Sequence, residues 1–173
     1  MQLQIAIETE DTMRNVQKFG DRRSRKGNVS GFSLIELLIV VAIILIIAAI
    51  AIPNLIRAKA AANESVASAS IHAINIAEVA YSSVNPTIGF AAALADLGPA
   101  GSGYLESNLA GGSKSGYNFA YVPTGGVPYQ GYSLNADPIV RSITGQRSFF
   151  SSQDNVTHYD PNAPATNASP VLQ

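Results

Sequence analysis

The sequence predicts an α+β fold, in which one long N-terminal α-helix packs on a small antiparallel β-sheet of three or four strands. The first observation behind this prediction is an apolar run over 32–52, followed by an alanine-rich stretch with only Pro53 as a helix breaker before residue 86. The second is a change of composition after residue 84, where short aromatic or β-branched pieces alternate with turn signals.

Composition places the apolar residues in one segment. Hydrophobic residues make up 47% of the chain and charged residues 13%, which predicts a membrane element joined to a polar body. The net charge of −1 gives no reason to expect a nucleic-acid partner, and the absence of cysteine excludes disulfides and cysteine metal sites. Six of the eleven basic residues precede the apolar run, which favours a cytoplasmic N-terminus: Arg14, Lys18, Arg22, Arg23, Arg25 and Lys26.

Residues 1–31 read as a basic cytoplasmic leader that is removed from the mature chain. Its first dozen residues contain acids and show little helix periodicity, so Met13 is an alternative start. An ordinary secretory cleavage after the apolar run is disfavoured, because the sequence beyond it continues as helix.

Residues 32–53 form a hydrophobic half-helix, predicted to span the membrane and later to lie in a filament core. At 1.5 Å per residue the apolar run is roughly 31 Å long, enough to cross the hydrocarbon core. Its only polar residues are Ser33 and Glu36. Pro53 lacks a backbone donor, so we expect it to kink or loosen the helix.

Residues 54–83 form an amphipathic half-helix. We expect its four charged side chains, Arg57, Lys59, Glu64 and Glu78, to lie mostly away from the apolar face, as an amphipathic helix requires. The residues that approximate the apolar face are Ile56, Ala60, Ala67, Ile71, Ile74 and Tyr81.

Residues 84–173 form a globular antiparallel β domain with an irregular tail. The piece FAAALADLGP predicts a short helical turn, and the alternation of Tyr117, Phe119 and Tyr121 places aromatic rings on the sheet face that packs on the helix. The tail after residue 160 is too poor in apolar residues to fold alone and is expected along the surface. The predicted strands are 116–123, 128–136, 146–153 and 155–160.

The segment Gly31-Phe32-Ser33-Leu34-Ile35-Glu36, continued by LLIVVAII and closed by AAIAIP, resembles the N-terminus of a type IV prepilin. The resemblance implies that a prepilin peptidase cuts between Gly31 and Phe32 on the cytoplasmic side and methylates the new amine. It implies a single-pass inner-membrane precursor in contact with lipid and with the pilus assembly machinery. The mature subunits then form a homo-oligomeric helical filament at the cell surface, with the helices inside.

Two residues depart from the commoner family pattern. Ser33 stands in place of threonine, which is a conservative change. Leu45 stands where many members have glycine, so we expect a stiffer helix between Leu45 and Pro53 than in pilins that melt there.

Glu36 is the one charge in the apolar run. It is of little use as a conventional helix cap, and an unpaired carboxylate is very costly inside a helix bundle. The available counter-charge is the amine of Phe32, four residues away on the same helix face and created only by cleavage. We therefore expect Glu36 to pair with the Phe32 amine of an adjacent subunit and to set the axial register.

The remaining polar residues give no case for catalysis, a metal or a cofactor. His72 and His158 are expected at the surface, and no G-x-S-x-G elbow places a nucleophile. Asp154, Asn155 and Asp160 are oxygen ligands of the type calcium prefers, but their spacing favours a polar turn.

The sequence therefore predicts a structural protein, the major subunit of a type IV pilus used for adhesion, motility or DNA uptake. The alternative is a pseudopilin of a type II secretion system, which shares the N-terminal motif. The family's major pseudopilin commonly has a tryptophan-containing calcium loop, and this chain has no tryptophan. A membrane-anchored enzyme would need a catalytic constellation within 84–173, and none is evident.

Overall fold

The computed structural model describes residues 31–173. Most of the predicted leader, including Met13, lies outside the described residues. The first element is the helix α2, Leu34–Val84, and the chain divides within it into one unit that ends at Ile43 and a second unit, Ile44–Gln173.

Helix α2 forms because alanine and leucine favour helix and because no glycine interrupts it. It is 51 residues long and is continuous through both Leu45 and Pro53. Pro53 cannot donate to the preceding turn, but the Asn54 side-chain amide donates to the carbonyl of Ile50 at 3.1 Å. The turn at Pro53 remains helical within α2.

The sheet has five antiparallel strands in the order β1-β2-β3-β4-β5, a simple meander. The α+β prediction is confirmed, but the predicted count of three or four strands is wrong by one. The missed strand is β1, whose two residues are too few to show any alternation. The strands are β1 (Ser113–Lys114), β2 (Tyr117–Thr124), β3 (Gly131–Pro138), β4 (Ser148–Ser152) and β5 (His158–Asp160).

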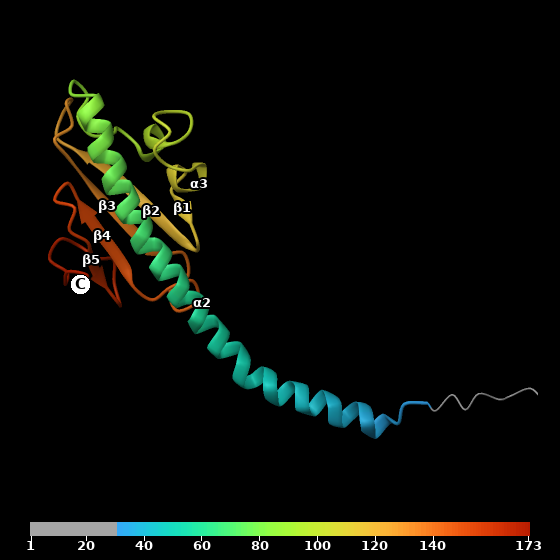
Figure 1. Cartoon of the computed structure of the whole chain (residues 1–173). Coiled ribbons are helices and arrows are strands. Elements are labelled where there is room, and N and C mark those ends of the chain that lie inside the picture. Colours follow the sequence, from blue (N-terminus) through green and yellow to red (C-terminus); the bar gives the residue numbers. More distant parts are fainter. Residues whose placement is uncertain (1–30) are drawn as a thin grey trace, which may run out of the picture. The chain divides into compact units, whose positions relative to one another are not determined.

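The part of α2 from Ala60 onward lies along one face of this sheet (Figure 1). As predicted, Tyr117 and Phe119 of β2 are buried against the helix, and Tyr121 packs on the edge of the same core. Alternate residues of β2 and β3 form this layer because successive side chains of a strand point to opposite faces. The core also includes Ile71, Ile74, Leu97, Leu134 and Phe149.

The segment between α2 and β1 contains two short helices, η1 (Leu94–Leu97) and α3 (Ser107–Ala110). The predicted short helical turn corresponds to η1, whose Leu94 and Leu97 are buried in the core. A glycine is required in the turn between β1 and β2. Gly116 has a φ of +75°, and a Cβ there would come within 2.8 Å of Thr144.

The C-terminal tail is tied to the outer edge of β5. The amide of Tyr159 donates to the carbonyl of Pro170 at 2.9 Å, and that of Leu172 donates to Thr157 at 2.8 Å. Asn135 donates to the carbonyl of Ala165, which is buried. The tail runs along the surface, as expected, and it also covers an otherwise open sheet edge.

Candidate processing and assembly site

The predicted cleavage point lies in the non-helical segment immediately before α2. Gly31, Phe32 and Ser33 precede the helix, and 78% of the surface of Phe32 is exposed. A Cβ at Gly31 would meet no atom of the described residues within 4 Å, and its φ lies outside the left-handed region. The fold of the chain itself therefore sets no requirement for glycine here, so any such requirement belongs to a partner.

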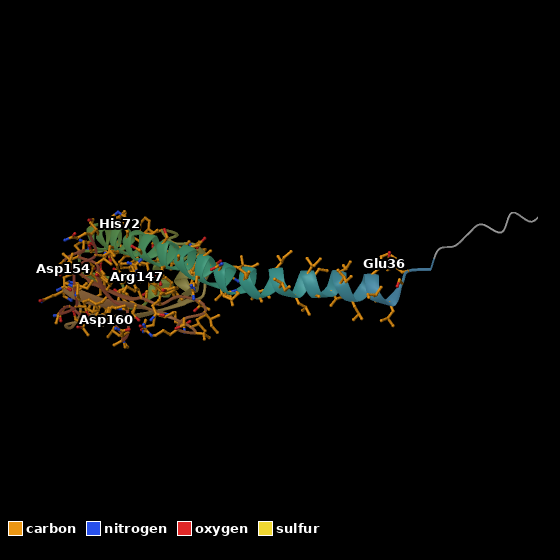
Figure 2. The ribbon with its side chains drawn as sticks, turned by 90° about the horizontal axis from the view of Figure 1, so that it is seen from below. Glu36, His72, Arg147, Asp154 and Asp160 are labelled. Carbon is orange, nitrogen blue, oxygen red and sulfur yellow. The ribbon has the colours of Figure 1, made fainter. Side chains whose placement is uncertain are left out.

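Glu36 does act as a helix cap, contrary to the expectation from sequence. Its Oε2 accepts the backbone N–H of Ser33 at 2.9 Å. Ser33 immediately precedes the first helical residue, and Glu36 is the third residue of the helix, which is the carboxylate half of a capping box. Figure 2 shows Glu36 at this end of the helix. In the uncleaved chain, in which Gly31 and Phe32 are joined by a peptide bond, this hydrogen bond stabilises the start of the helix.

From Leu37 to Ile52 the helix is apolar on every side. None of its most apolar stretch is buried by the described residues, and the mean hydropathy there is 3.3. Its large aliphatic side chains point outward all round the ribbon (Figure 2), each with roughly half or more of its surface exposed. An apolar surface of this extent is found in soluble monomers only where something covers it, and lipid or other helices would do so.

Two glutamates of the second half of α2 point into the domain, which corrects the expectation that they lie away from the apolar face. Only 8% of the surface of Glu64 and none of that of Glu78 is exposed. Counted along the helix, they fall on the same three-and-four spacing as Ala60, Ala67 and Ile71. That spacing was the signal that could have found them.

Glu64 joins α2 to the start of β4. Its Oε1 accepts the backbone N–H groups of Gln146 and Arg147 at 2.7 and 3.1 Å, and its Oε2 accepts Nε of Arg147 at 2.7 Å. Burial alone would raise the pKa of Glu64, but these hydrogen bonds and the guanidinium charge outweigh it and hold the pKa below its ordinary value. The guanidinium also lies 5.6 Å from the Phe149 ring centre and 5.7 Å from that of Tyr159.

Glu78 has a less complete set of partners. Its Oε2 accepts the N–H of Ala91 at 3.0 Å, and its Oε1 is buried without a hydrogen-bond partner among the described residues. Burial raises the pKa of Glu78, and the nearby charge of Asp96 raises it further. The Tyr121 hydroxyl beside it donates to the carbonyl of Ala91 at 2.9 Å. Glu78 therefore holds the segment after α2 against the helix at an electrostatic cost.

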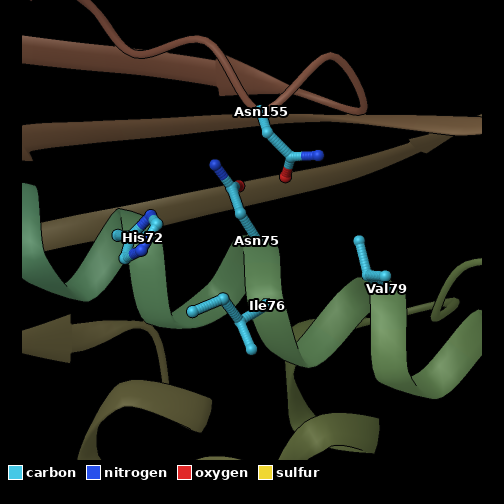
Figure 3. Close-up of a pocket in the computed structure, with 5 residues that line it drawn as sticks. All are labelled: His72, Asn75, Ile76, Val79 and Asn155. Atoms are coloured by element: carbon cyan, nitrogen blue, oxygen red, sulfur yellow. The ribbon is translucent and has the colours of Figure 1, made fainter.

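Asn75 makes the third polar connection between helix and sheet. Its amide donates to Oγ of Ser151 at 2.9 Å, and its carbonyl oxygen accepts the Tyr132 hydroxyl at 2.9 Å. Asn75 also borders a hollow of about 210 Å³, shown in Figure 3, with Ile76, Val79, His72 and Asn155. Its lining contains no carboxylate, so the geometry offers no acid–base pair.

The other residues considered for chemistry have structural roles. His72 is exposed, as predicted, but His158 is 9% exposed, and its Nδ1 lies 2.6 Å from the carbonyl oxygen of Ser169, which corrects the expectation of a surface position. The carboxylate of Asp154 accepts the N–H of Val156, and that of Asp160 accepts two turn amides. Within residues 31–173 no three histidine or acidic side chains gather as metal ligands would.

The N-terminal segment is similar to segments of known proteins. A family model described as the prokaryotic N-terminal methylation motif matches residues 26–52, which include Gly31, Phe32 and Glu36. The chain is 46% identical over 72 residues to the type IV wide pilus major component PilA4 of Thermus thermophilus. Over the aligned segments the chain is therefore similar to type IV pilins. It is also 47% identical over 68 residues to the type IV major pilin protein PilA of Myxococcus xanthus.

The aligned part is 41% of this chain and 55% of PilA4, and for PilA it is 35% of the chain and 31% of the relative. The chain thus spans about half the length, or less, of the curated relatives it matches. No solved structure matches it. The pseudopilin alternative is not favoured, because both relatives are pilus components.

Proposed function

We propose that the chain is the structural subunit of a type IV pilus. It is made as a single-pass inner-membrane precursor with its N-terminus in the cytoplasm, and a prepilin peptidase cuts it after Gly31 and methylates Phe32. The assembly machinery then moves subunits from lipid into a surface filament through α2. Adhesion, motility and DNA uptake all fit such a filament, and no residue selects among them.

The observation that supports assembly best is the outward face of α2. From Ala60 to Val84 the helix has only two charged residues, Glu64 and Glu78, and both are turned into the domain. A helix that faces water normally carries charges on that face. This one presents an uncharged line at three-and-four spacing, made of Ala62, Ser65, Ala69, His72, Ile76, Val79 and Ser83, all exposed.

Small residues on this line suit contact with a helix of another copy. Alanine and serine let two helices approach closely, and the three-and-four spacing matches the ridges that interlock at a small crossing angle. Burial of the apolar surface supplies free energy at roughly 25 cal/mol for each Å² removed from water. On the same helix the apolar surface of 37–52 precedes this line, and the exposed Arg57 and Lys59 lie between the two.

Glu36 supplies register in this proposal. In an isolated subunit its carboxylate caps the helix through Ser33. Among packed apolar helices it needs a counter-charge, because a buried unpaired carboxylate is very costly. Cleavage converts the amide nitrogen of Phe32 into an amine, and the amine of an adjacent subunit pairs with Glu36 only at one axial offset.

The test starts with N-terminal sequencing and mass measurement of sheared surface fibres. We expect the chain to begin at a methylated Phe32. Glu36→Gln keeps an oxygen for the Ser33 amide but removes the charge, so we expect it to be processed normally and to polymerise poorly. A Glu36→Val protein that is cut and still assembles at the wild-type level would contradict the pairing, and fibres with a different N-terminus would contradict the processing site.

A further inference from the structure

The segment between β3 and β4, residues 139–147, exposes three β-branched side chains in a small area. The exposed fractions are 52% for Ile139, 45% for Val140 and 55% for Ile143. Isolated apolar residues at a surface are ordinary, but three within five positions of one turn form a patch that calls for a partner. We call these three residues the aliphatic patch.

The turn that carries the aliphatic patch is braced rather than loose. Its ends are closed by the amide of Thr144, which donates to the carbonyl of Val140 at 2.8 Å, and by the Ile139 amide, which donates to Gly116 at 2.9 Å. Asn63 of α2 donates to the carbonyl of Thr144 at 2.8 Å. The patch is therefore fixed in place against α2, and Figure 1 shows this orange segment beside the helix.

The predominantly apolar part of α2, residues 34–56, is called the apolar rod below. The patch lies at the level along α2 where the apolar rod ends and the part that packs on the sheet begins. Arg57 and Ala60 line the same hollow of about 300 Å³ as Ser142, one of the two residues between Val140 and Ile143. Ile56 is the last large apolar residue before this point, and four residues of helix separate it from Ala60, or about 6 Å. The headgroup layer on each side of a bilayer is about 5–8 Å thick. The patch thus lies at headgroup depth when the apolar rod is in lipid.

Basic residues accompany the patch at the same level. Arg57 and Lys59 are exposed, and neither makes an ion pair with another described residue. Two carboxylates of the domain are exposed: Glu106 pairs with Lys114 at 2.7 Å, and Asp154 accepts hydrogen bonds from Ser152 and Val156. An anionic leaflet presents a much denser negative charge to Arg57 and Lys59 than these two separate carboxylates of a second copy.

We propose that the aliphatic patch and the pair Arg57 and Lys59 form a membrane-surface dock that seats the domain on an anionic lipid bilayer before assembly. The occupant is the headgroup boundary of the leaflet from which α2 emerges. Aliphatic side chains beside cations are the combination that binds this boundary. The inference rests on the membrane precursor of the proposed function and adds a lipid contact made by the domain itself.

The absence of cysteine allows a direct test on the full-length precursor in vesicles of phosphatidylethanolamine and phosphatidylglycerol. A fluorophore sensitive to polarity is attached at Ser142→Cys. The matched control is Thr87→Cys, which follows the far end of α2, roughly 40 Å along the axis from Ile56. A third reporter, Ile47→Cys, records insertion of the rod. We expect the Ser142 reporter to be blue-shifted and quenched by headgroup-level nitroxide lipids, and the Thr87 reporter to remain in water.

Variants separate the two parts of the dock. Ile139→Ser with Ile143→Ser should return the Ser142 reporter to a water-like spectrum, whereas Val127→Ser, at the exposed far turn of the β2–β3 hairpin, should not. Replacing Arg57 and Lys59 by glutamine should lower the docked-to-undocked ratio by roughly fivefold per charge in anionic vesicles. In phosphatidylcholine vesicles the same replacement should have little effect.

A Ser142 reporter as water-exposed as that at Thr87, with Ile47 in lipid, would refute the dock and leave the proposed function intact. An Ile47 reporter outside lipid would overturn both. A Ser142 signal that rises only with the number of copies per vesicle would assign the patch to a second copy and also refute the lipid dock.

Discussion

Replacement of Glu78 by glutamine should stabilise the domain at neutral pH, although the side chain is fully buried. The carboxylate has one N–H partner, from Ala91, and one oxygen without a partner among the described residues. Glutamine keeps an oxygen for the Ala91 amide and removes the charge that burial penalises. The Tyr121 hydroxyl beside it offers an acceptor for the new amide group.

The pH dependence of this gain follows from the direction of the pKa shift. Because the pKa of Glu78 is higher in the folded than in the unfolded chain, its contribution to stability is complete below the ordinary value of 4.5 and is lost as pH rises through the folded pKa. Leaving a buried polar atom without a hydrogen-bond partner costs about 1–3 kcal/mol, so we expect Glu78→Gln to gain an amount of this order near neutral pH and almost nothing below pH 4.5.

The assay is denaturant unfolding of the full chain in detergent micelles at several pH values. The seven tyrosines report domain packing by near-ultraviolet circular dichroism. Glu78→Ala serves as the comparison, since it loses the Ala91 partner as well and should be less stable than the wild type at every pH. A glutamine variant less stable than the wild type throughout would show that the ionised carboxylate is well solvated, and the reasoning would be wrong.

Three further predictions concern other parts of the chain. Glu64→Gln should lower the free energy of unfolding by about 1–3 kcal/mol at neutral pH, because Arg147 loses its buried partner. Because the pKa of Glu64 is lowered in the folded chain, this loss should shrink as the pH falls below 4.5. The control Glu106→Gln, in an exposed ion pair, should change the free energy of unfolding by less than about 1 kcal/mol. Ala69→Glu should leave the free energy of unfolding within about 0.5 kcal/mol of the wild type and abolish fibres in electron micrographs. Gly31→Val should leave the circular dichroism unchanged and stop removal of the leader on immunoblots; normal maturation would contradict the assignment of Gly31.

Sequence reasoning was most successful where periodicity is long. The apolar rod and the alanine-rich stretch are dozens of residues long, and local preference and tertiary packing agree over that length, so α2 was predicted within two residues at each end. Four strands were also found in order from their aromatic and β-branched composition. β1 was missed because a two-residue strand is defined by its partner β2 and by the turn at Gly116.

In the candidate site, too, residues in a contiguous motif could be predicted from the sequence, whereas residues whose partners come from distant segments could not. Gly31, Phe32 and Glu36 could be proposed from the sequence because the motif that contains them is contiguous; their roles in processing and assembly stay predictions. The inward positions of Glu64 and Glu78 were missed because composition treats a carboxylate as a solvent-facing residue. Only the fold reveals the backbone amides that make such a position tolerable. His158 was misjudged for the same reason, since its partner is contributed by the tail.

In the proposed fibre, the polar connections between α2 and the domain also determine how a subunit responds to mechanical load. Asn63, Glu64, Asn75 and Glu78 bind the domain at successive levels along 60–84. Tension along the helix axis loads all of them in shear at once, whereas a force that lifts the helix off the sheet would break them one after another. A subunit pulled along the direction of its helix therefore shares the force among its polar anchors, and it is weakest against peeling from the Glu78 end.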